Sequence, residues 1–291
     1  MASKDLGQVV PTIPTKIKGS RNFVYEGENL ITKFGNVSAL SSAVQAGNFA
    51  DVNIGDYIQV TLSGNFKDYA ANTTKSINQV MTFEAMPDFF INTNGMNQNH
   101  HILFLSRDLL GQNIQMRSEN STWYDSTVDN PWLGSHLFQT LNSLTDGIRH
   151  LMDQTILAGH IYDPDGNGKG IKQYAEKKAS GAANATSWDN YYRGALFLPT
   201  ETEVWGHAAF SEARVLGNAN AQGSLQWPIF RDSYRHVQKS NTPGGSRISW
   251  GVASSVAGSA ADFCLVSSGG MPGSGSAAGT GVGVPVGFLF R

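Results

Sequence analysis

Hydrophobic positions along the chain follow both helical and strand-like spacing, and they predict a mixed fold. Apolar residues recur every three or four positions over residues 135–156, the longest helical pattern, in which Gly147 marks a break. Two-residue alternation at Ile58, Val60 and Leu62 predicts a strand after a turn. Further strand-like runs cover residues 79–85, 89–92 and 101–105.

Three shorter patterns complete this picture. Ser38 is expected to cap a helix that runs through Val44 and ends at Gly47. Residues 194–199 form a short strand-like run that ends at a proline, and the capping box of Thr200 and Glu203 then predicts a second helix start. Because helices and strands alternate irregularly, we expect an α+β fold and not a doubly wound parallel sheet.

The two ends of the chain differ in composition from its middle. Pro11 and Pro14 exclude a helix near the N-terminus, so residues 1–35 are expected to form an extended arm. This arm either lies across a neighbouring subunit, anchors the protein, or is a flexible leader. Residues 36–291 are expected to form the compact domain.

The last 50 residues contain 12 glycines and nine serines but only three charged residues. Two apolar runs, 263–266 and 282–290, bracket the small-residue stretch 267–281. This pattern predicts a strand, an excursion of small residues, and a closing strand.

Composition excludes several classes of protein. The net charge is −2, from 21 basic and 23 acidic residues without basic clusters, so a nucleic-acid partner is not expected. No apolar stretch reaches the roughly 18 residues of a membrane span, and the N-terminus lacks the apolar run of a secretory signal. The single cysteine, Cys264, allows no disulfide within the chain and no multi-cysteine metal site.

The motif with the clearest chemistry is a short acidic loop. Asp163, Asp165 and Asn167, followed by Gly168, match the first half of a calcium-binding loop. The acid expected at the twelfth position is replaced by Tyr174, so the motif leaves two alternatives, a calcium site and a metal-free turn.

Other motifs with catalytic or metal-binding chemistry are missing. His100 and His101 are adjacent, so on a strand they would point to opposite faces and would not chelate one metal jointly. The sequence shows no nucleophile elbow, phosphate-binding loop or dinucleotide fingerprint. We therefore expect a protein that is not an enzyme.

The order of several short segments resembles a known family. These segments are Asn53 to Ile58, Asn99 to Ile102, Trp123-Tyr124 with Trp132, Leu196 to Val204, Gln226 to Phe230, Ser249-Trp250, Ala261 to Val266, and Gly281 to Phe288. Over about residues 50–291 the chain is similar to virion surface proteins from phages and prophages of gut Firmicutes, whose C-terminal region has a C-type-lectin-like fold. It is more distantly similar to phage tropism determinants and to the variable proteins of diversity-generating retroelements.

Two positions depart from that family. The chain has Trp250-Gly251-Val252 where the family usually has Trp-Leu-Arg, and Gly283-Val284-Pro285 where it closes on Gly-Val-Arg-Pro. These departures bear on the packing of the last strands and not on the architecture.

The resemblance implies a non-enzymatic protein on the virion surface, assembled in the host bacterial cytoplasm, that binds a glycan or protein of the host surface. It implies that the arm docks on a capsid or tail protein and that the chain forms a homo-oligomer; a trimer would suit a virion projection. The alternatives are a capsid decoration or head-fibre protein without a ligand and, third, a hydrolase of surface polysaccharide. The position of the family's binding surface corresponds here to Trp250, Ser254, Ser255, Ser267, Ser268, Met271, Ser274, Ser276 and Thr280.

Overall fold

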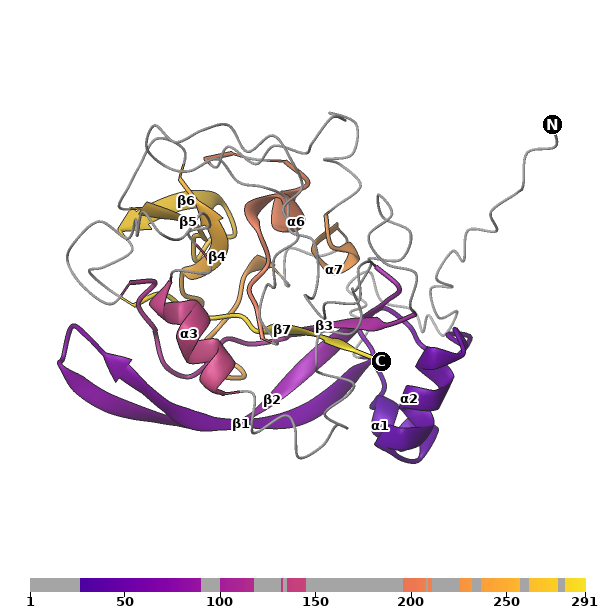
Figure 1. The fold of residues 1–291 in the computed structure, drawn as a ribbon. Helices are drawn as coiled ribbons and strands as arrows, with labels where there is room; N and C mark the ends of the chain where they lie inside the picture. The colour runs from indigo at the N-terminus through magenta and orange to yellow at the C-terminus, as the bar shows by residue number, and fades with distance from the viewer. Residues whose placement is uncertain are drawn as a thin grey trace, which may run out of the picture.

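The computed structural model describes residues 27–89, 100–117, 132, 135–144, 196–207, 209–210, 226–231, 237–256, 262–276 and 281–291. Over these ranges the chain forms an α+β fold of two antiparallel sheets with short helices around them (Figure 1). Within the same ranges, no helix combines the length and apolarity needed to cross a bilayer.

The helices are α1 (Leu30–Phe34), α2 (Val37–Gln45), α3 (His136–Ser143), α6 (Glu201–Trp205) and α7 (Pro228–Arg231). The strands are β1 (Tyr57–Asp68), β2 (Thr73–Pro87), β3 (Ile102–Ser106), β4 (Trp250–Ser255), β5 (Asp262–Val266), β6 (Pro272–Ser276) and β7 (Gly287–Phe290).

The larger sheet has the order β1-β2-β3-β7, and its first two strands form a long curved hairpin along one side of the molecule (Figure 1). All twelve residues of β1 pair with β2, from Tyr57 opposite Glu84 to Asp68 opposite Thr73. Ile58, Val60 and Leu62 are buried while the residues between them are exposed, which confirms the predicted alternation. The predicted run 79–85 lies inside β2, which begins earlier because the hairpin extends beyond the core.

The main core lies against the inner strands of this sheet. Every residue of β3 and β7 is buried, as expected of strands that are covered on both faces. The ring of Phe288 lies 4.9 Å from that of Phe83 and 5.2 Å from that of Phe104, measured between centroids. The predicted strand 101–105 is therefore confirmed as β3, shifted by one residue.

The smaller sheet, β4-β5-β6, is joined to the core by stacked aromatic rings. Trp250 stacks on Phe230, and Phe230 stacks on Trp227, with centroid separations of 6.2 and 6.0 Å. The indole N–H of Trp250 donates to the carbonyl of Val237 at 2.8 Å. These contacts fix the sheet to the segment that precedes it.

Local capping chemistry explains where the helices begin. Thr200 and Glu203 form the predicted capping box at the start of α6. The predicted helix at residues 38–44 is present as α2, but Asn36 caps it in place of Ser38, accepting a bond from the N–H of Ala39 at 2.9 Å. Ser135 caps α3, and the predicted continuation over residues 145–156 lies outside the described residues.

The expected boundary between arm and domain at residue 35 is wrong. Residues 30–34 form α1, in which Leu30 is fully buried, and Asn29 caps this helix through the N–H of Thr32. The N–H of Tyr57 donates to the carbonyl of Glu28 at 2.9 Å. Residues 27–35 therefore belong to the fold, and residues 1–26 lie outside the described part of the chain.

The glycine- and serine-rich stretch 267–281 is more regular than predicted, because it contains β6 paired with β5. Glycines at 273 and 275 are poor strand formers, but their missing side chains leave room for Leu265 on the paired strand. The predicted closing strand 282–290 is divided into single bridges at Val282 and Gly283 and the strand β7. The predicted strand at 194–199 is reduced, in its described part, to one bridge between Phe197 and Gly287.

Candidate ligand-binding surface

The turn between β5 and β6 spans residues 267–271 and is closed by its own hydrogen bonds. The N–H of Ser267 donates to the carbonyl of Met271 at 2.9 Å, and Ser267 Oγ accepts from the N–H of Met271 at 3.1 Å. The N–H of Gly270 donates to the carbonyl of Ser267 at 2.8 Å. Gly270 has a φ of +85°, a conformation that favours glycine. The turn therefore has one defined shape.

A second segment supports this turn from behind. Gln238 Nε2 donates to the carbonyl of Gly269 at 2.8 Å. A Cβ atom on Gly270 would lie 3.1 Å from Gln238 Cγ, so the two segments are in close contact. Gln238 stands between Val237 and Lys239, which are both buried. The turn is thus held by a residue whose neighbours are fixed in the interior.

The outer side of the turn presents hydroxyl groups around one apolar side chain. Met271 is 62% exposed, and Ser268 and Ser274 are exposed nearby on the same hairpin. Serine hydroxyls both donate and accept hydrogen bonds, and the thioether of methionine packs on apolar surfaces of varied shape. Residues 267–276 carry no charge. The turn therefore presents hydrogen-bonding hydroxyl groups and one apolar side chain without any charge.

Four of the residues expected on the binding surface come together on the β5–β6 hairpin. They are Ser267, Ser268, Met271 and Ser274. Ser255 and Ser276 end β4 and β6, and their side chains are outside the description, as is the whole of Thr280.

Two of the expected surface residues lie in the interior, which corrects the prediction. Trp250 and Ser254 are completely buried. Ser254 Oγ accepts a bond from the backbone N–H of Glu201 at 2.9 Å, so it serves the start of α6 and not a ligand. Trp250 lies opposite Val266, whose side chain is also buried. β4 reads Trp-Gly-Val-Ala-Ser-Ser, and its small side chains give too little contrast between apolar and polar positions to predict which residues face inward.

The predicted calcium ligands Asp163, Asp165 and Asn167 lie outside the described residues. Among the residues that are described, no three His, Cys, Asp or Glu side chains are grouped to hold a metal ion.

His100 and His101 share a single carboxylate, that of Asp88. His100 Nδ1 lies 2.6 Å from Asp88 Oδ2, and the backbone N–H of His101 donates to Asp88 Oδ1 at 2.9 Å.

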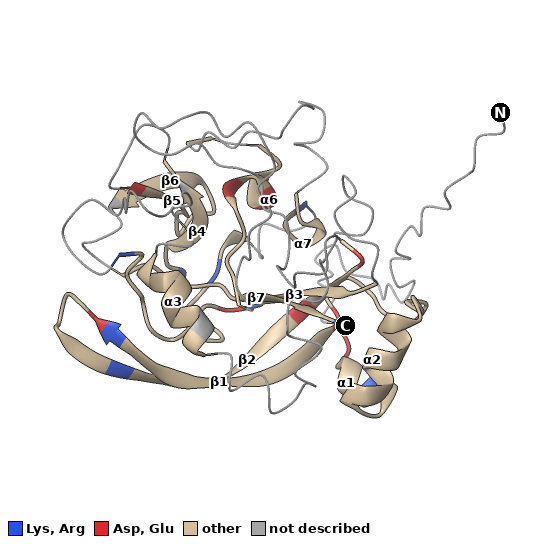
Figure 2. Cartoon of the chain, viewed as in Figure 1, with Lys and Arg blue, Asp and Glu red and all other residues tan. Residues whose placement is uncertain are grey.

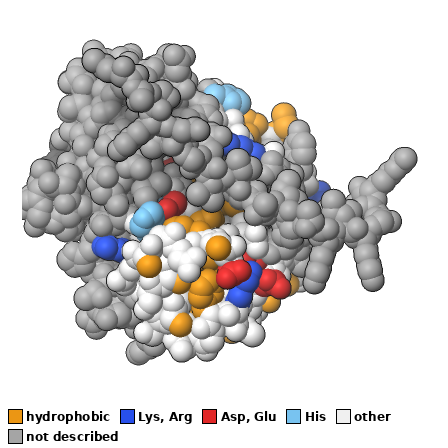
Figure 3. All heavy atoms as spheres, turned by 90° about the vertical axis from the view of Figure 1, so that its right-hand side faces the viewer, with side chains coloured by type: hydrophobic (Ala, Val, Ile, Leu, Met, Phe, Trp, Pro, Cys, Tyr) orange, Lys and Arg blue, Asp and Glu red, His pale blue; other side chains and the backbone are white. Residues whose placement is uncertain are grey.

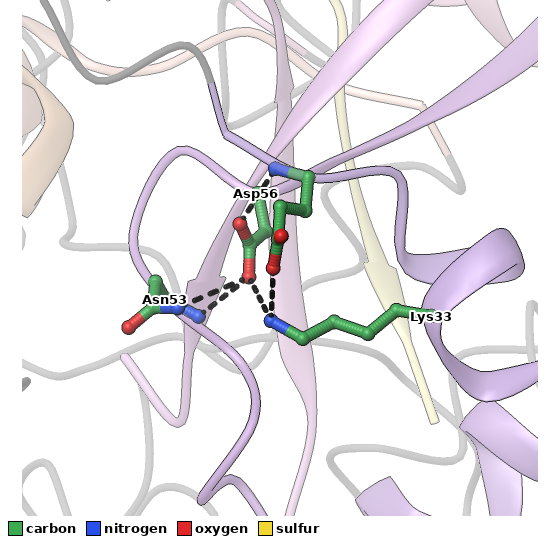
Figure 4. A network of polar contacts seen from close by, with 4 residues as sticks. Lys33, Asn53 and Asp56 are labelled. Atoms are coloured by element: carbon green, nitrogen blue, oxygen red, sulfur yellow. Dashed lines mark hydrogen bonds and ion pairs between the residues drawn. The ribbon is translucent and has the colours of Figure 1, made fainter. Parts of the chain in front are cut away.

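Asp56 is a buried carboxylate that sequence reasoning did not single out as important (Figure 4). Its Oδ1 accepts from the N–H of Glu28 at 2.8 Å, and its Oδ2 accepts from the N–H of Asn53 at 2.9 Å. Lys33 Nζ lies 3.4 Å from the same Oδ2 and 2.8 Å from Glu28. Burial lowers the pKa of Lys33, but its bonds and charge pairing with Glu28 and Asp56 outweigh this and raise it. The carboxylate therefore ties α1 to the start of β1.

Lys239 is a second buried charge that the sequence pattern did not reveal. Its Nζ donates to the carbonyls of Ser106 at 2.5 Å and Arg107 at 3.0 Å. Burial lowers the pKa of Lys239 to about 8, although nearby Glu84 and Asp108 favour the charged form. The bond from Arg107 Nε to Glu84 Oε1, at 2.9 Å, joins β2 to the end of β3. These polar contacts connect β2, the end of β3 and the segment that contains Lys239.

A separate groove of about 280 Å³ lies between α1, α2 and the start of β1. Its lining includes Ile31, Val37, Ile58, Val60 and Phe290. On this side of the molecule apolar side chains are visible among uncharged ones, next to a small cluster of acidic and basic groups (Figure 3). The volume is just below the roughly 300 Å³ at which small-molecule pockets begin.

The fold and this surface define the class of protein: an α+β framework that presents an uncharged hairpin turn. Residues 99–290, which are 192 of the 291, match the family described as a domain of unknown function, DUF6273, and the chain belongs to that family. No curated protein matches the chain. No solved structure matches it either. The hairpin lies inside the family region, whereas α1, α2, β1 and β2 precede it.

Proposed function

We propose that this protein is a non-enzymatic virion surface protein that binds a glycan or protein of the host surface through the turn at residues 267–271. In this proposal the family region has a C-type-lectin-like architecture, and the segment before Gly27 attaches the protein to a capsid or tail. The resemblance to phage and prophage surface proteins supports the virion setting. The exposed side chains of the turn support the proposal that this turn contacts the host ligand.

The observation that carries the proposal is the combination of a fixed turn with exposed, uncharged side chains. Three hydrogen bonds close the turn and Gln238 holds it, yet Met271 remains 62% exposed beside Ser268. A loop that is already ordered loses little conformational entropy when a ligand binds.

Small side chains limit the affinity of one copy. A few hydroxyl groups and one thioether bury little area, so each contact is expected to be weak. Many copies on one particle raise the overall affinity without any new contact, because later binding events become intramolecular. Display on a virion therefore fits the chemistry of the turn better than action as a single free molecule.

The test compares the turn, where Met271 is exposed, with a control site on β2, where Val80 is exposed to a similar extent. Ser268→Ala with Met271→Ala alters the turn, and Val80→Ala alters a side chain that is 64% exposed on β2. Binding of multivalent protein to a panel of gut Firmicutes cells and their purified surface glycans is measured for each variant. The turn variant is expected to bind at least about tenfold more weakly, and the Val80 variant as the wild type does.

Equal binding by both variants would refute the turn as the contact. If no cell or glycan in the panel binds even the wild type, the purely structural decoration protein is favoured instead. Release of soluble glycan fragments during the incubation would contradict the non-enzymatic assignment.

A further inference from the structure

The groove between α1, α2 and the start of β1 is lined mainly by apolar side chains. Ile58, Val60 and Phe290 are buried, and Ile31 and Val37 are half-buried beside them. The other lining residues in the described part of the chain are polar and uncharged: Asn29, Thr32 and Gln59. The last two of these are exposed, so they form a rim through which the groove can be entered. A further apolar segment can bury surface in a groove of this kind.

The charge and the size of the groove limit what can occupy it. α1 and α2 together contain one charged residue, Lys33, which Figure 2 shows on α1. This lysine is already paired with Glu28 and Asp56. The volume of about 280 Å³ is below the roughly 300 Å³ of small-molecule sites. The groove therefore favours a few uncharged side chains of a peptide segment.

The chain before Gly27 contains one segment with these properties. Residues 6–15 are its longest run without a charged residue, and they include Val10-Pro11 and Ile13-Pro14. Each proline fixes its own φ and confines the residue before it to extended conformations, so the run loses less entropy on binding than a flexible peptide does. These restrictions favour polyproline II, which has three residues per turn. Val10 and Ile13 are then on one side of the segment, about 9 Å apart.

The position of Gly27 puts this segment within reach of the groove. Asn29 lines the groove and stands two residues after Gly27, at most about 7 Å along the chain. Twelve residues, 15–26, connect Pro14 to Gly27. A flexible chain of this length spans on the order of 20 Å. Such a tether gives the segment a high effective concentration at its own groove, so even a weak contact is populated.

We propose that residues 9–14 dock in the groove of their own chain, with Val10 and Ile13 as the buried side chains. The segment covers the half-buried apolar residues of α1 and α2, and the chain before it leaves the molecule from one fixed place. This contact does not depend on the proposed ligand surface, which lies on the other sheet. Residues 1–8 stay available for the attachment to a capsid or tail proposed above.

Paired cysteines in the full-length protein test this contact. The native Cys264 is 1% exposed, so the introduced thiols react only with each other. Thr12→Cys is combined with Thr32→Cys in one variant and with Gln59→Cys in another, because both partners lie on the rim. Thr12→Cys with Ala46→Cys is the matched control, because Ala46 is exposed at the far end of α2. During mild oxidation, at least one rim pair is expected to form its disulfide about tenfold faster than the control pair.

Charges placed in the segment test which side chains make the contact. Val10→Asp with Ile13→Asp, added to the rim pair, brings two carboxylates to an uncharged groove and is expected to slow the disulfide to the control rate. Gln8→Asp with Thr15→Asp adds the same two charges outside residues 9–14 and is expected to leave the rate unchanged. Circular dichroism checks that every variant is folded.

Non-reducing electrophoresis distinguishes the segment of the same chain from that of a second copy. A disulfide within one chain keeps the mass of one chain, whereas docking between copies gives a product of two chains. The expected result is a rapid disulfide within one chain that the Val10 and Ile13 aspartates abolish. Equal rates for rim and control cysteines, a product of two chains, or a rate that the aspartates leave unchanged would each overturn the proposal.

Discussion

The two sheets of this protein are stabilised in different ways. In the larger sheet, rows of bulky apolar residues face the core, and buried charges such as Asp56 tie neighbouring elements to it. In the smaller sheet, glycines stand where side chains would collide. A Cβ atom on Gly251 would lie 2.8 Å from Val282 Cγ2, and one on Gly275 would lie 2.7 Å from Leu265 Cδ2.

The larger sheet therefore forms the framework of the fold, and the smaller sheet carries the candidate surface. A sheet with a large core tolerates an exposed face of any polarity, and that of β1 and β2 is almost uncharged. In the smaller sheet the outer strand β6 consists of proline, glycine and serine, which offer little apolar area to bury, so this strand depends on contacts with the segments packed against it. We therefore expect substitutions to cost most at the charged connections of the framework and least on the outer strand of the small sheet.

The largest effect is expected for Asp56→Ala. This change leaves the N–H groups of Glu28 and Asn53 without their acceptor and removes a charge partner of Lys33. We expect the free energy of unfolding to fall by about 3 kcal/mol, measured by urea denaturation. Glu28→Gln is the control, because its exposed ion pair is worth less than about 1 kcal/mol. Equal losses in both variants would contradict a special role for the buried carboxylate.

A smaller, pH-dependent effect is expected from Lys239. Its pKa is about 8 in the folded protein and near 10.5 in the unfolded chain. Between these values the unfolded chain holds the extra proton, so this group makes folding more favourable as the pH rises. Relative to Lys239→Met, the wild type should gain up to about 3 kcal/mol of unfolding free energy across this range.

Denaturation of both proteins at several pH values between these limits measures this gain. Groups other than Lys239 titrate alike in the two proteins and cancel in the difference. A constant difference between wild type and Lys239→Met would show that the lysine is not desolvated in the folded state.

The sequence predicted those parts of the fold that depend on local chemistry. The capping box at Thr200 and the alternation of Ile58, Val60 and Leu62 were confirmed, because short-range bonds and the burial of one face determine them. Asn36 replaced Ser38 as a cap because both residue types cap helices and stand only two positions apart.

Features that depend on distant contacts were missed. β6 has glycines at 273 and 275 and becomes a strand because β5 pairs with it, which no local pattern shows. Lys239 stands in a polar stretch of sequence, and only its contacts with Ser106 and Arg107 reveal its burial. The residues expected on the candidate surface include exposed and buried positions for the same reason. The resemblance pointed to this part of the sequence, but it did not separate exposed Met271 from buried Trp250.

The smallest expected effect concerns two glycines, one in the outer strand of the smaller sheet and one in the segment behind it. A Cβ atom on Gly281 would lie 2.8–2.9 Å from backbone atoms of Asn113 and Ile114, which are fixed by the bridge to Val282. A Cβ atom on Gly273 would meet Leu265 Cδ1 at 2.9 Å, but this side chain is only half-buried and can rotate away. Thermal denaturation should therefore show a loss of about 2 kcal/mol for Gly281→Ala and less than about 1 kcal/mol for Gly273→Ala. The reverse order would mean that the outer strand, and not the segment behind it, limits the stability of the small sheet.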